Sequence, residues 1–524
     1  MIIDGRTIPA SSTIAADLCI IGAGAAGITL ALALEATQAK ILLLESGGLV
    51  PEPGPQDLTK GELAGQRYVP LESSRLRCLG GSTMHWGGWC RPLEPADFET
   101  RDWVPHSGWP INHTHIDPYY ARAQEICQLG EFDYDPAGWE LPQGSVLNLP
   151  ADRIRSRLIQ FSPPTRFGLR YREALEKSKA ITTCLHSTVT QIATPENGRT
   201  VAALRVATLP GHGFSVVANR YVVAAGGIDN PRLLLASSET VKHGLGNDHD
   251  LVGRFFADHI QLDTAAVFPQ DPHLNMELYQ PTSRELPRRS KRAAGRAANV
   301  MAYLTLDPRV QRERRTVNYS AKVIETTWSS YFTGENTANE TERQGWEGFT
   351  HSLRSLWRNI DDEAQAEFRP GGHSAKMYKV VTTQEQAPNP NSRVRLSQQR
   401  DAVGMPRPIL EWRLSELDRH SVQVALDELI RGFGTSGIAK LHTPLDLSAG
   451  FPDEVPISWH HYGTTRMSND PTTGVVNADG RVHGIENLYI AGSSIFPTCG
   501  AGNPTLNIVA LTLRLADHLR QTLT

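Results

Sequence analysis

The chain has 524 residues, a formal net charge of -4 at pH 7 and a hydrophobic fraction of 40%. This length exceeds what one simple hydrophobic core supports, so we expect two closely joined domains. The weak negative charge gives no electrostatic case for binding nucleic acid or an anionic membrane, which leaves small molecules as the expected partners.

The cysteines and the amino-terminal segment favour a reducing compartment. Six cysteines are scattered without CxxC spacing, which predicts neither a zinc site nor a disulfide framework. Residues 1–12, MIIDGRTIPASS, lack the basic start and the apolar stretch of a secretory signal. The apolar run from Leu18 to Leu34 barely reaches the length of a membrane span and contains three glycines. We therefore expect a cytoplasmic protein with no membrane span.

That apolar run is better explained as a buried strand, a tight turn and a packed helix. Its GAGAAG segment places Gly22, Gly24 and Gly27 in the GxGxxG spacing of a dinucleotide-binding turn. A second strand, KILLLES, ends at Glu45, where an acid can accept hydrogen bonds from ribose hydroxyls. This order of elements predicts a dinucleotide site, and the alanine-rich turn favours FAD, although the spacing alone leaves NAD open. The same site includes Ala26 and Ser46.

A second glycine-rich segment, RCLGGSTMHWGGWCRP, follows at residues 77–92. Glycines let the backbone come close to a flat ligand while large side chains point at it. A glycine-rich surface loop with one incidental aromatic residue is the alternative, and the segment alone leaves both interpretations open. The candidate ligand-binding residues are Gly80, Gly81, Ser82, His85, Trp86, Gly87 and Gly88.

The carboxyl-terminal segment predicts a strand followed by a helix. NLYIAGSS, residues 487–494, has the form of a buried strand that ends in small residues. Residues 503–519, NPTLNIVALTLRLADHL, predict a helix with Asn503 at its N-cap and Pro504 in its first turn. The free amides and partial positive charge at this helix start suit an anionic reduced flavin.

These blocks together make the chain similar to the glucose-methanol-choline (GMC) oxidoreductase family. Matching motifs lie within residues 17–260 and 455–524, whereas the stretch between them is not recognisable. STMHW and the carboxyl-terminal motif are most similar to the pyranose oxidase and fructose dehydrogenase branch. The blocks that carry the resemblance are GAGAAG (22–27), LGGSTMHWGG (79–88), AAGGIDNPRLLLAS (224–237), LVGRFFADHI (251–260) and the segment from HHYGTTRM (460–467) to NPT (503–505).

The resemblance implies an α/β fold class. It consists of a Rossmann-like FAD-binding domain and a second, α+β substrate-binding domain built on an antiparallel sheet. Residues 1–90, 150–260 and 445–524 would form the FAD-binding domain. Residues 91–149 and 261–444 would form the substrate-binding domain.

The resemblance also implies an enzyme that oxidises a secondary alcohol of a sugar, glycoside or polyol by hydride transfer to FAD. The family pattern HxxGT falls on His460, and the second active-site residue of the family falls on Asn503. A neutral histidine, with an ordinary pKa of about 6.5, suits removal of the hydroxyl proton. His461 would face away, because neighbouring side chains of an extended segment point to opposite sides.

Further FAD contacts follow from the resemblance alone. His85 falls where the pyranose oxidase branch has a histidine that can bond covalently to the flavin, and noncovalent binding is the alternative. Ala491 departs from the aspartate that many members carry in the last strand. The remaining implied contacts are Val189, Ala225, Gly226, Gly492, Ser493, Asn503, Pro504 and Thr505.

Two other functions remain open at this point. One is oxidation of a non-sugar alcohol in secondary metabolism, and the other is a flavin-containing lyase without net redox chemistry. The electron acceptor could be oxygen, a quinone or a redox protein, and we expect a quinone or dye to serve better than oxygen. The basic stretch at residues 283–296 has no aromatic residue and predicts a solvated loop rather than a nucleic-acid site, and the polar stretch at 329–345 is similar.

Overall fold

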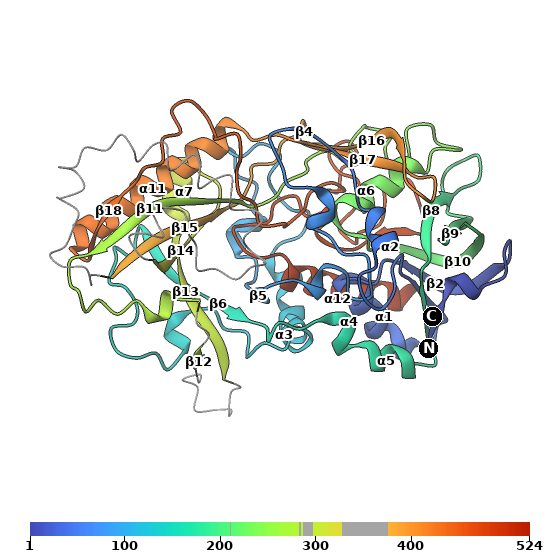
Figure 1. Ribbon diagram of the computed structural model, residues 1–524, viewed down its shortest axis with the longest axis horizontal. Helices are drawn as coiled ribbons and strands as arrows, with labels where there is room; N and C mark the ends of the chain where they lie inside the picture. The colour runs from blue at the N-terminus through green and yellow to red at the C-terminus, as the bar shows by residue number, and fades with distance from the viewer. Residues whose placement is uncertain (210, 282–283, 287–296, 327–375, 524) are drawn as a thin grey trace.

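The computed structural model describes residues 1–209, 211–281, 284–286, 297–326 and 376–523. The polar stretch 329–345 lies outside the described residues, as does most of the basic stretch 283–296. Two large sheets organise the rest, one at each end of the elongated molecule (Figure 1).

The first sheet has eight strands in the order β1-β7-β3-β2-β10-β9-β8, with β19 paired to β10. All pairs are parallel except those that β9 makes with β10 and β8. The inner strand β3 reads ILLL and is buried throughout, as expected for a parallel strand covered on both faces. The strands are β1 (Ile2–Asp4), β2 (Thr13–Ile21), β3 (Ile41–Leu44), β7 (Ile181–Leu185), β8 (Thr188–Ala193), β9 (Ala203–Ala207), β10 (Gly213–Val223) and β19 (Leu488–Ile490).

Helix α1 (Ala25–Leu34) follows β2 and packs against α12 (Thr505–Leu523). Its start depends on Gly27, because a Cβ there would lie 1.9 Å from the carbonyl oxygen of Gly22. The other helices are α2 (Pro53–Asp57), α3 (Asp117–Ile126), α4 (Phe167–Arg170), α5 (Arg172–Lys177), α6 (Gly226–Ala236), α7 (Pro308–Arg314) and α11 (Glu416–Ser436).

The second sheet also has eight strands, in the order β18-β11-β15-β14-β13-β6-β5, with β12 paired to β13. Every pair in it is antiparallel. The strands are β5 (Trp89–Cys90), β6 (Ile154–Phe161), β11 (Ile260–Pro269), β12 (Arg284–Leu286), β13 (Ala298–Leu306), β14 (Tyr319–Thr326), β15 (Met377–Gln384) and β18 (Ala439–His442). A small third sheet joins β4 (Glu62–Gly65), β16 (Arg393–Arg400) and β17 (Pro406–Trp412).

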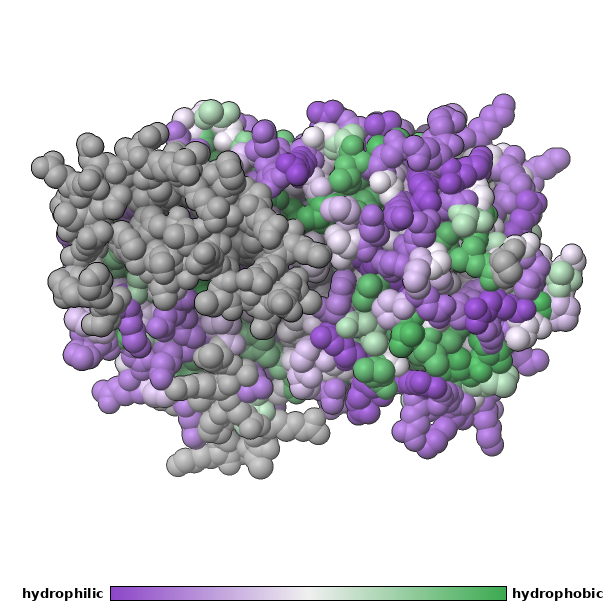
Figure 2. Space-filling model, in the orientation of Figure 1, coloured by the Kyte–Doolittle hydropathy of each residue, from purple (hydrophilic) through white to green (hydrophobic). Residues whose placement is uncertain are grey.

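The predicted fold class is confirmed: a largely parallel sheet with helices stands beside an antiparallel sheet. The division of the chain between two domains stays a prediction. Strands β5 and β6 fall within residues 1–90 and 150–260, the ranges expected for FAD binding, yet they pair in the second sheet. Hydrophilic residues dominate much of the described surface over the first sheet, with smaller hydrophobic areas between them (Figure 2). Among the described residues, no helix combines the length and apolar character of a membrane span.

Candidate active site

A cavity of about 1620 Å³ contains most of the predicted site residues. It collects residues from the first sheet, the second sheet and the loops before β19 and α12. Gly27 and Gly80 do not line it; Gly27 lies behind it at the contact between α1 and the glycine turn. The predicted residues that do line it are Gly22, Gly24, Ala26, Glu45, Ser46, Gly81, Ser82, His85, Trp86, Gly87, Gly88, Val189, Ala225, Gly226, His460, Gly492, Ser493, Asn503, Pro504 and Thr505.

One end of the cavity is a cradle of main chain at the start of α1. Gly22 turns the chain with a left-handed φ of 104°, which L side chains rarely adopt. A Cβ on Gly24 would meet no atom within 4 Å, so the cavity reaches this backbone directly. No acidic residue and no side-chain cap occupies the first turn of α1, which leaves its amides for an anionic ligand.

Glu45 follows β3 and ties this cradle to the next loop. Its carboxylate accepts the backbone N–H of Ala23 at 2.9 Å and that of Gly47 at 2.9 Å. Burial raises the pKa of this carboxyl, while the hydrogen bonds oppose the rise. A carboxylate has about four lone-pair sites, so two remain for further donors such as ribose hydroxyls.

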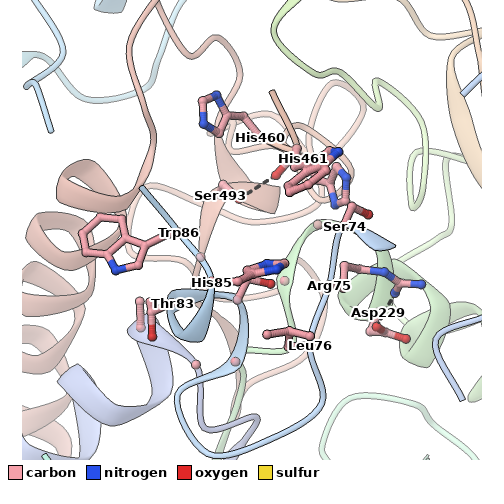
Figure 3. Close-up of a pocket in the computed structure, with 18 of the residues that line it drawn as sticks. Ser74, Arg75, Leu76, Thr83, His85, Trp86, Asp229, His460, His461 and Ser493 are labelled. Carbon is pink, nitrogen blue, oxygen red and sulfur yellow. Dashed lines mark hydrogen bonds and ion pairs between the residues drawn. The ribbon is translucent and has the colours of Figure 1, made fainter. Parts of the chain in front are cut away.

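Three arginines around Asp229 give the middle of the cavity wall a net positive charge. Arg75, Arg77 and Arg232 all form ion pairs with this carboxylate. Burial alone would raise the pKa of Asp229, but the three guanidinium groups hold it well below its ordinary value. Figure 3 shows Arg75 turned to Asp229 beside the cavity. Sequence reasoning missed this cluster, although the cluster lies within or next to two recognised blocks.

The other end of the cavity holds His460 in a chain of side-chain contacts. Its Nε2 lies 3.0 Å from Nδ2 of Asn503, and its Nδ1 lies 2.8 Å from Nδ1 of His259. Burial, His259 and Lys322 hold the pKa of His460 well below its ordinary value. The imidazole is therefore neutral near neutral pH and can accept a proton.

Asp258 fixes the backbone beneath these rings. Its Oδ1 accepts the N–H of His259 at 2.7 Å and that of His460 at 2.8 Å, and Tyr68 donates its hydroxyl to Oδ2 at 2.6 Å. Burial raises the pKa of this carboxyl to about 6, against the effect of those hydrogen bonds. Asp258 and His259 lie in the block LVGRFFADHI (251–260), but the sequence pattern assigns a role to neither residue.

His461 also lines the cavity, but its ring has other neighbours than the ring of His460, so the expectation that it faces away from the flavin stays a prediction. Trp459, directly before the two histidines, adopts a left-handed φ of 60°, so the alternation of an extended segment does not run through it. The ring of His461 packs against those of Tyr68 and Phe256, with centroids 6.1 and 5.6 Å away. Burial lowers its pKa to about 3, and Figure 3 shows the rings of His460 and His461 turned in different directions.

Comparison with known proteins agrees with this geometry. The family model described as GMC oxidoreductase matches residues 388–512. The chain is 23% identical to the fructose dehydrogenase large subunit of Gluconobacter japonicus, over 97% of this chain and 98% of that one. It is 24% identical to 2-methyl-1,2-propanediol dehydrogenase of Mycolicibacterium austroafricanum, over 96% and 95%. A formate oxidase structure from Aspergillus oryzae RIB40 shares the fold, with a TM-score of 0.57, 16% identity and coverage of 98% and 99%.

The chain is thus similar to GMC oxidoreductases, by the family model over residues 388–512 and by relatives over nearly its whole length. FAD is the cofactor of GMC oxidoreductases, and the cavity fits such a group. The cradle at Gly24 suits the pyrophosphate. A Cβ would meet no atom within 4 Å at Gly226 or at Gly492, so both leave open space for a large planar ligand beside the first sheet.

Two residues implied by the GMC resemblance have specific surroundings. His85 stacks on Trp459, with ring centroids 5.8 Å apart, and burial lowers its pKa. Asn503 is not the N-cap of α12, because the helix begins at Thr505, two residues later. Its amide nitrogen instead contacts Nε2 of His460. The sequence pattern that predicts the helix gives no sign of this contact.

Proposed function

We propose that this protein is a GMC oxidoreductase that oxidises a secondary alcohol of a sugar, glycoside or polyol to a carbonyl, with His460 as the base. The observation that carries the proposal is the contact between His460 Nε2 and Asn503 Nδ2 in the same cavity as the glycine cradle. When bound, FAD supplies the acceptor for the hydride that leaves the carbinol carbon. In this proposal the first sheet holds the cofactor and the second sheet contributes the substrate side.

The proposed chemistry of the chain itself is proton removal and orientation. His460 Nε2 accepts the hydroxyl proton of the substrate, and its neutral state near pH 7 suits this step. Asn503 donates its amide N–H toward the substrate oxygen and stabilises the negative charge that develops there. Both groups must lie near one carbinol, which their 3.0 Å separation allows.

The second sheet supports a substrate with several hydroxyls. Gln261 on β11, Lys322 on β14 and Thr383 on β15 all line the cavity on the side of His460. These side chains can form hydrogen bonds with hydroxyl groups, while Trp89 and Trp459 offer rings to the apolar faces of a sugar. The names of the two relatives, a fructose and a diol dehydrogenase, likewise support a substrate with more than one hydroxyl.

Anaerobic mixing of the purified protein with a substrate panel tests this proposal. The panel contains pyranoses, glycosides, polyols and simple non-sugar alcohols. We expect a yellow protein whose flavin is bleached by at least one polyhydroxylated compound. Bleaching by non-sugar alcohols alone would favour the secondary-metabolism alternative. A protein that converts substrate without any bleaching would instead be a lyase.

The electron acceptor forms a separate part of the proposal. We propose that quinones or dyes reoxidise the flavin faster than oxygen does, supported by the two relatives named as dehydrogenases. Turnover is measured with the best substrate in air and with a dye under nitrogen. Hydrogen peroxide formed as fast as the dye is reduced would contradict this part and leave the substrate assignment intact.

A further inference from the structure

We propose that His259 is a positioning residue that fixes the tautomer of His460, so that Nε2 of His460 faces the substrate without a proton. His259 is fully buried and lies at the start of the second sheet, just before β11. It does not itself line the cavity, and its ring nitrogens contact His460 and the carbonyl of Gly500, so it acts through His460. The inference rests on the proposed function, because it assigns the atom of His460 that removes the proton.

The direction of the hydrogen bonds follows from one backbone carbonyl. His259 Nε2 lies 2.7 Å from the carbonyl oxygen of Gly500, which can only accept, so this nitrogen carries a proton. Burial lowers the pKa of His259 to about 4, so the ring is neutral near pH 7 and its Nδ1 has no proton. His460 Nδ1, 2.8 Å away, must therefore donate. A neutral imidazole has one N–H, which leaves Nε2 of His460 bare.

The contact between Asn503 and Nε2 of His460 leads to the same assignment of the His460 proton to Nδ1. Its Nδ2 is a donor and lies 3.0 Å from Nε2 of His460, which must accept. Gly500 and Asn503 belong to the same loop between β19 and α12. That loop therefore provides the groups at both ends of the hydrogen-bonded chain, the carbonyl of Gly500 and the amide of Asn503. The two histidines lie between these groups.

The carbonyl of Gly500 is itself held rigidly. Gly500 has a left-handed φ of 56°, and a Cβ there would lie 2.7 Å from the carboxylate of Asp97. Its N–H donates to Oε1 of Glu385 at 3.1 Å, and Oε2 of Glu385 pairs with Arg101 at 2.8 Å. A buried ion pair thus holds the N–H of the residue whose carbonyl sets the protonation of His259.

The charged groups around the two rings come from several elements. Glu385 favours a positive charge on His259, whereas Arg91 and burial oppose it. Lys322 and His461 oppose a positive charge on His460. When His460 Nε2 takes the substrate proton, the ring becomes an imidazolium, and the bare Nδ1 of His259 accepts its other N–H. The hydrogen bond then strengthens because its donor is charged.

Two substitutions separate this role from a merely structural one. His259→Asn can place an amide oxygen near the position of Nδ1 and keep the acceptor, whereas His259→Leu removes it. We expect His259→Leu to slow flavin reduction at saturating substrate by roughly 10- to 100-fold, with the substrate concentration for half-maximal rate changed by less than about twofold. His259→Asn should recover most of the rate. Equal losses in both variants would contradict the proposal.

Nitrogen-15 NMR of histidine-labelled holoenzyme reads the tautomer directly, even if a variant folds poorly. The signals of His460 are assigned by their loss in His460→Asn. We expect Nδ1 of His460 to carry the proton and Nε2 to be bare in the unmodified protein. A proton on Nε2 of His460 would overturn the inference. If no alcohol bleaches the flavin but this tautomer is found, the proposed function fails and the positioning role stands.

Discussion

The two ends of the cavity are built in different ways. The dinucleotide end, formed by residues 22–27 and Glu45, is mostly main chain shaped by glycines that lie close together in the sequence. The reacting end, formed by His460, Asn503, His259 and Asp258, is a network of side chains whose hydrogen-bonded partners lie up to 202 residues apart in the sequence. Backbone shape can thus be encoded locally, whereas the reacting end exists only after the two sheets have come together.

The largest expected effect is at Gly27, which tests the dinucleotide end. Gly27→Ala would place a Cβ 1.9 Å from the Gly22 carbonyl oxygen, so main chain must move. We expect the flavin to be lost and the free energy of unfolding to fall by about 1–3 kcal/mol or more. Flavin absorbance after gel filtration and denaturant unfolding of the apoprotein measure the two effects.

Gly24→Ala is the matched control, since its Cβ would meet no atom within 4 Å and would project into the cavity. The apoprotein should remain as stable as the unmodified one, and only the affinity for FAD should fall. Undiminished FAD binding in both variants would show that the cradle does not hold the cofactor.

The next largest effect is expected at Asn503, in the reacting end. Asn503→Ala removes the donor next to His460 Nε2 and should slow flavin reduction by about 10- to 100-fold. Asn503→His keeps a donor and should lose less. Because α12 begins at Thr505, the alanine variant should not show the stability loss of a missing N-cap. An N-cap loss of about 1 kcal/mol with a normal rate would contradict the assigned role.

The sequence indicates more of the residues that line the dinucleotide end than of those that make up the reacting end. The GxGxxG spacing, the second strand and Glu45 all depend on neighbours near in sequence, and Gly22, Gly24 and Glu45 line one cavity. His259 contacts the ring of His460, which lies 201 residues further along the chain, and no local sequence pattern indicates such a contact. The left-handed φ of Trp459 likewise breaks the alternation of side chains that the letters ISWHHYG indicate. The sequence gives no warning of this break, because tryptophan rarely adopts a left-handed φ.

The smallest expected effect concerns the pH dependence of the reacting end. Lys322 helps to hold the pKa of His460 below its ordinary value, so Lys322→Gln should raise that pKa. His460 would then stay protonated to a higher pH, and the acid limb of the flavin-reduction rate should move upward by less than about one pH unit. The rate at saturating substrate is measured between about pH 5 and 8.

Arg395→Gln is the control for this shift, because Arg395 lies on β16 and does not line the cavity. It should leave the pH profile unchanged. An acid limb that moves downward in Lys322→Gln would contradict the electrostatic account of His460.

The central claim is that His460, and not its neighbour in the same cavity wall, removes the proton. Anaerobic stopped-flow reduction of the flavin by the best substrate is the direct measurement, with His460→Ala and His461→Ala compared under the same conditions. We expect His460→Ala to retain FAD and slow reduction by about 100- to 10,000-fold, the range for loss of a positioned base. His461→Ala should cost much less, because its ring contacts Tyr68 and Phe256 rather than Asn503. Normal reduction in His460→Ala together with slow reduction in His461→Ala would contradict the account.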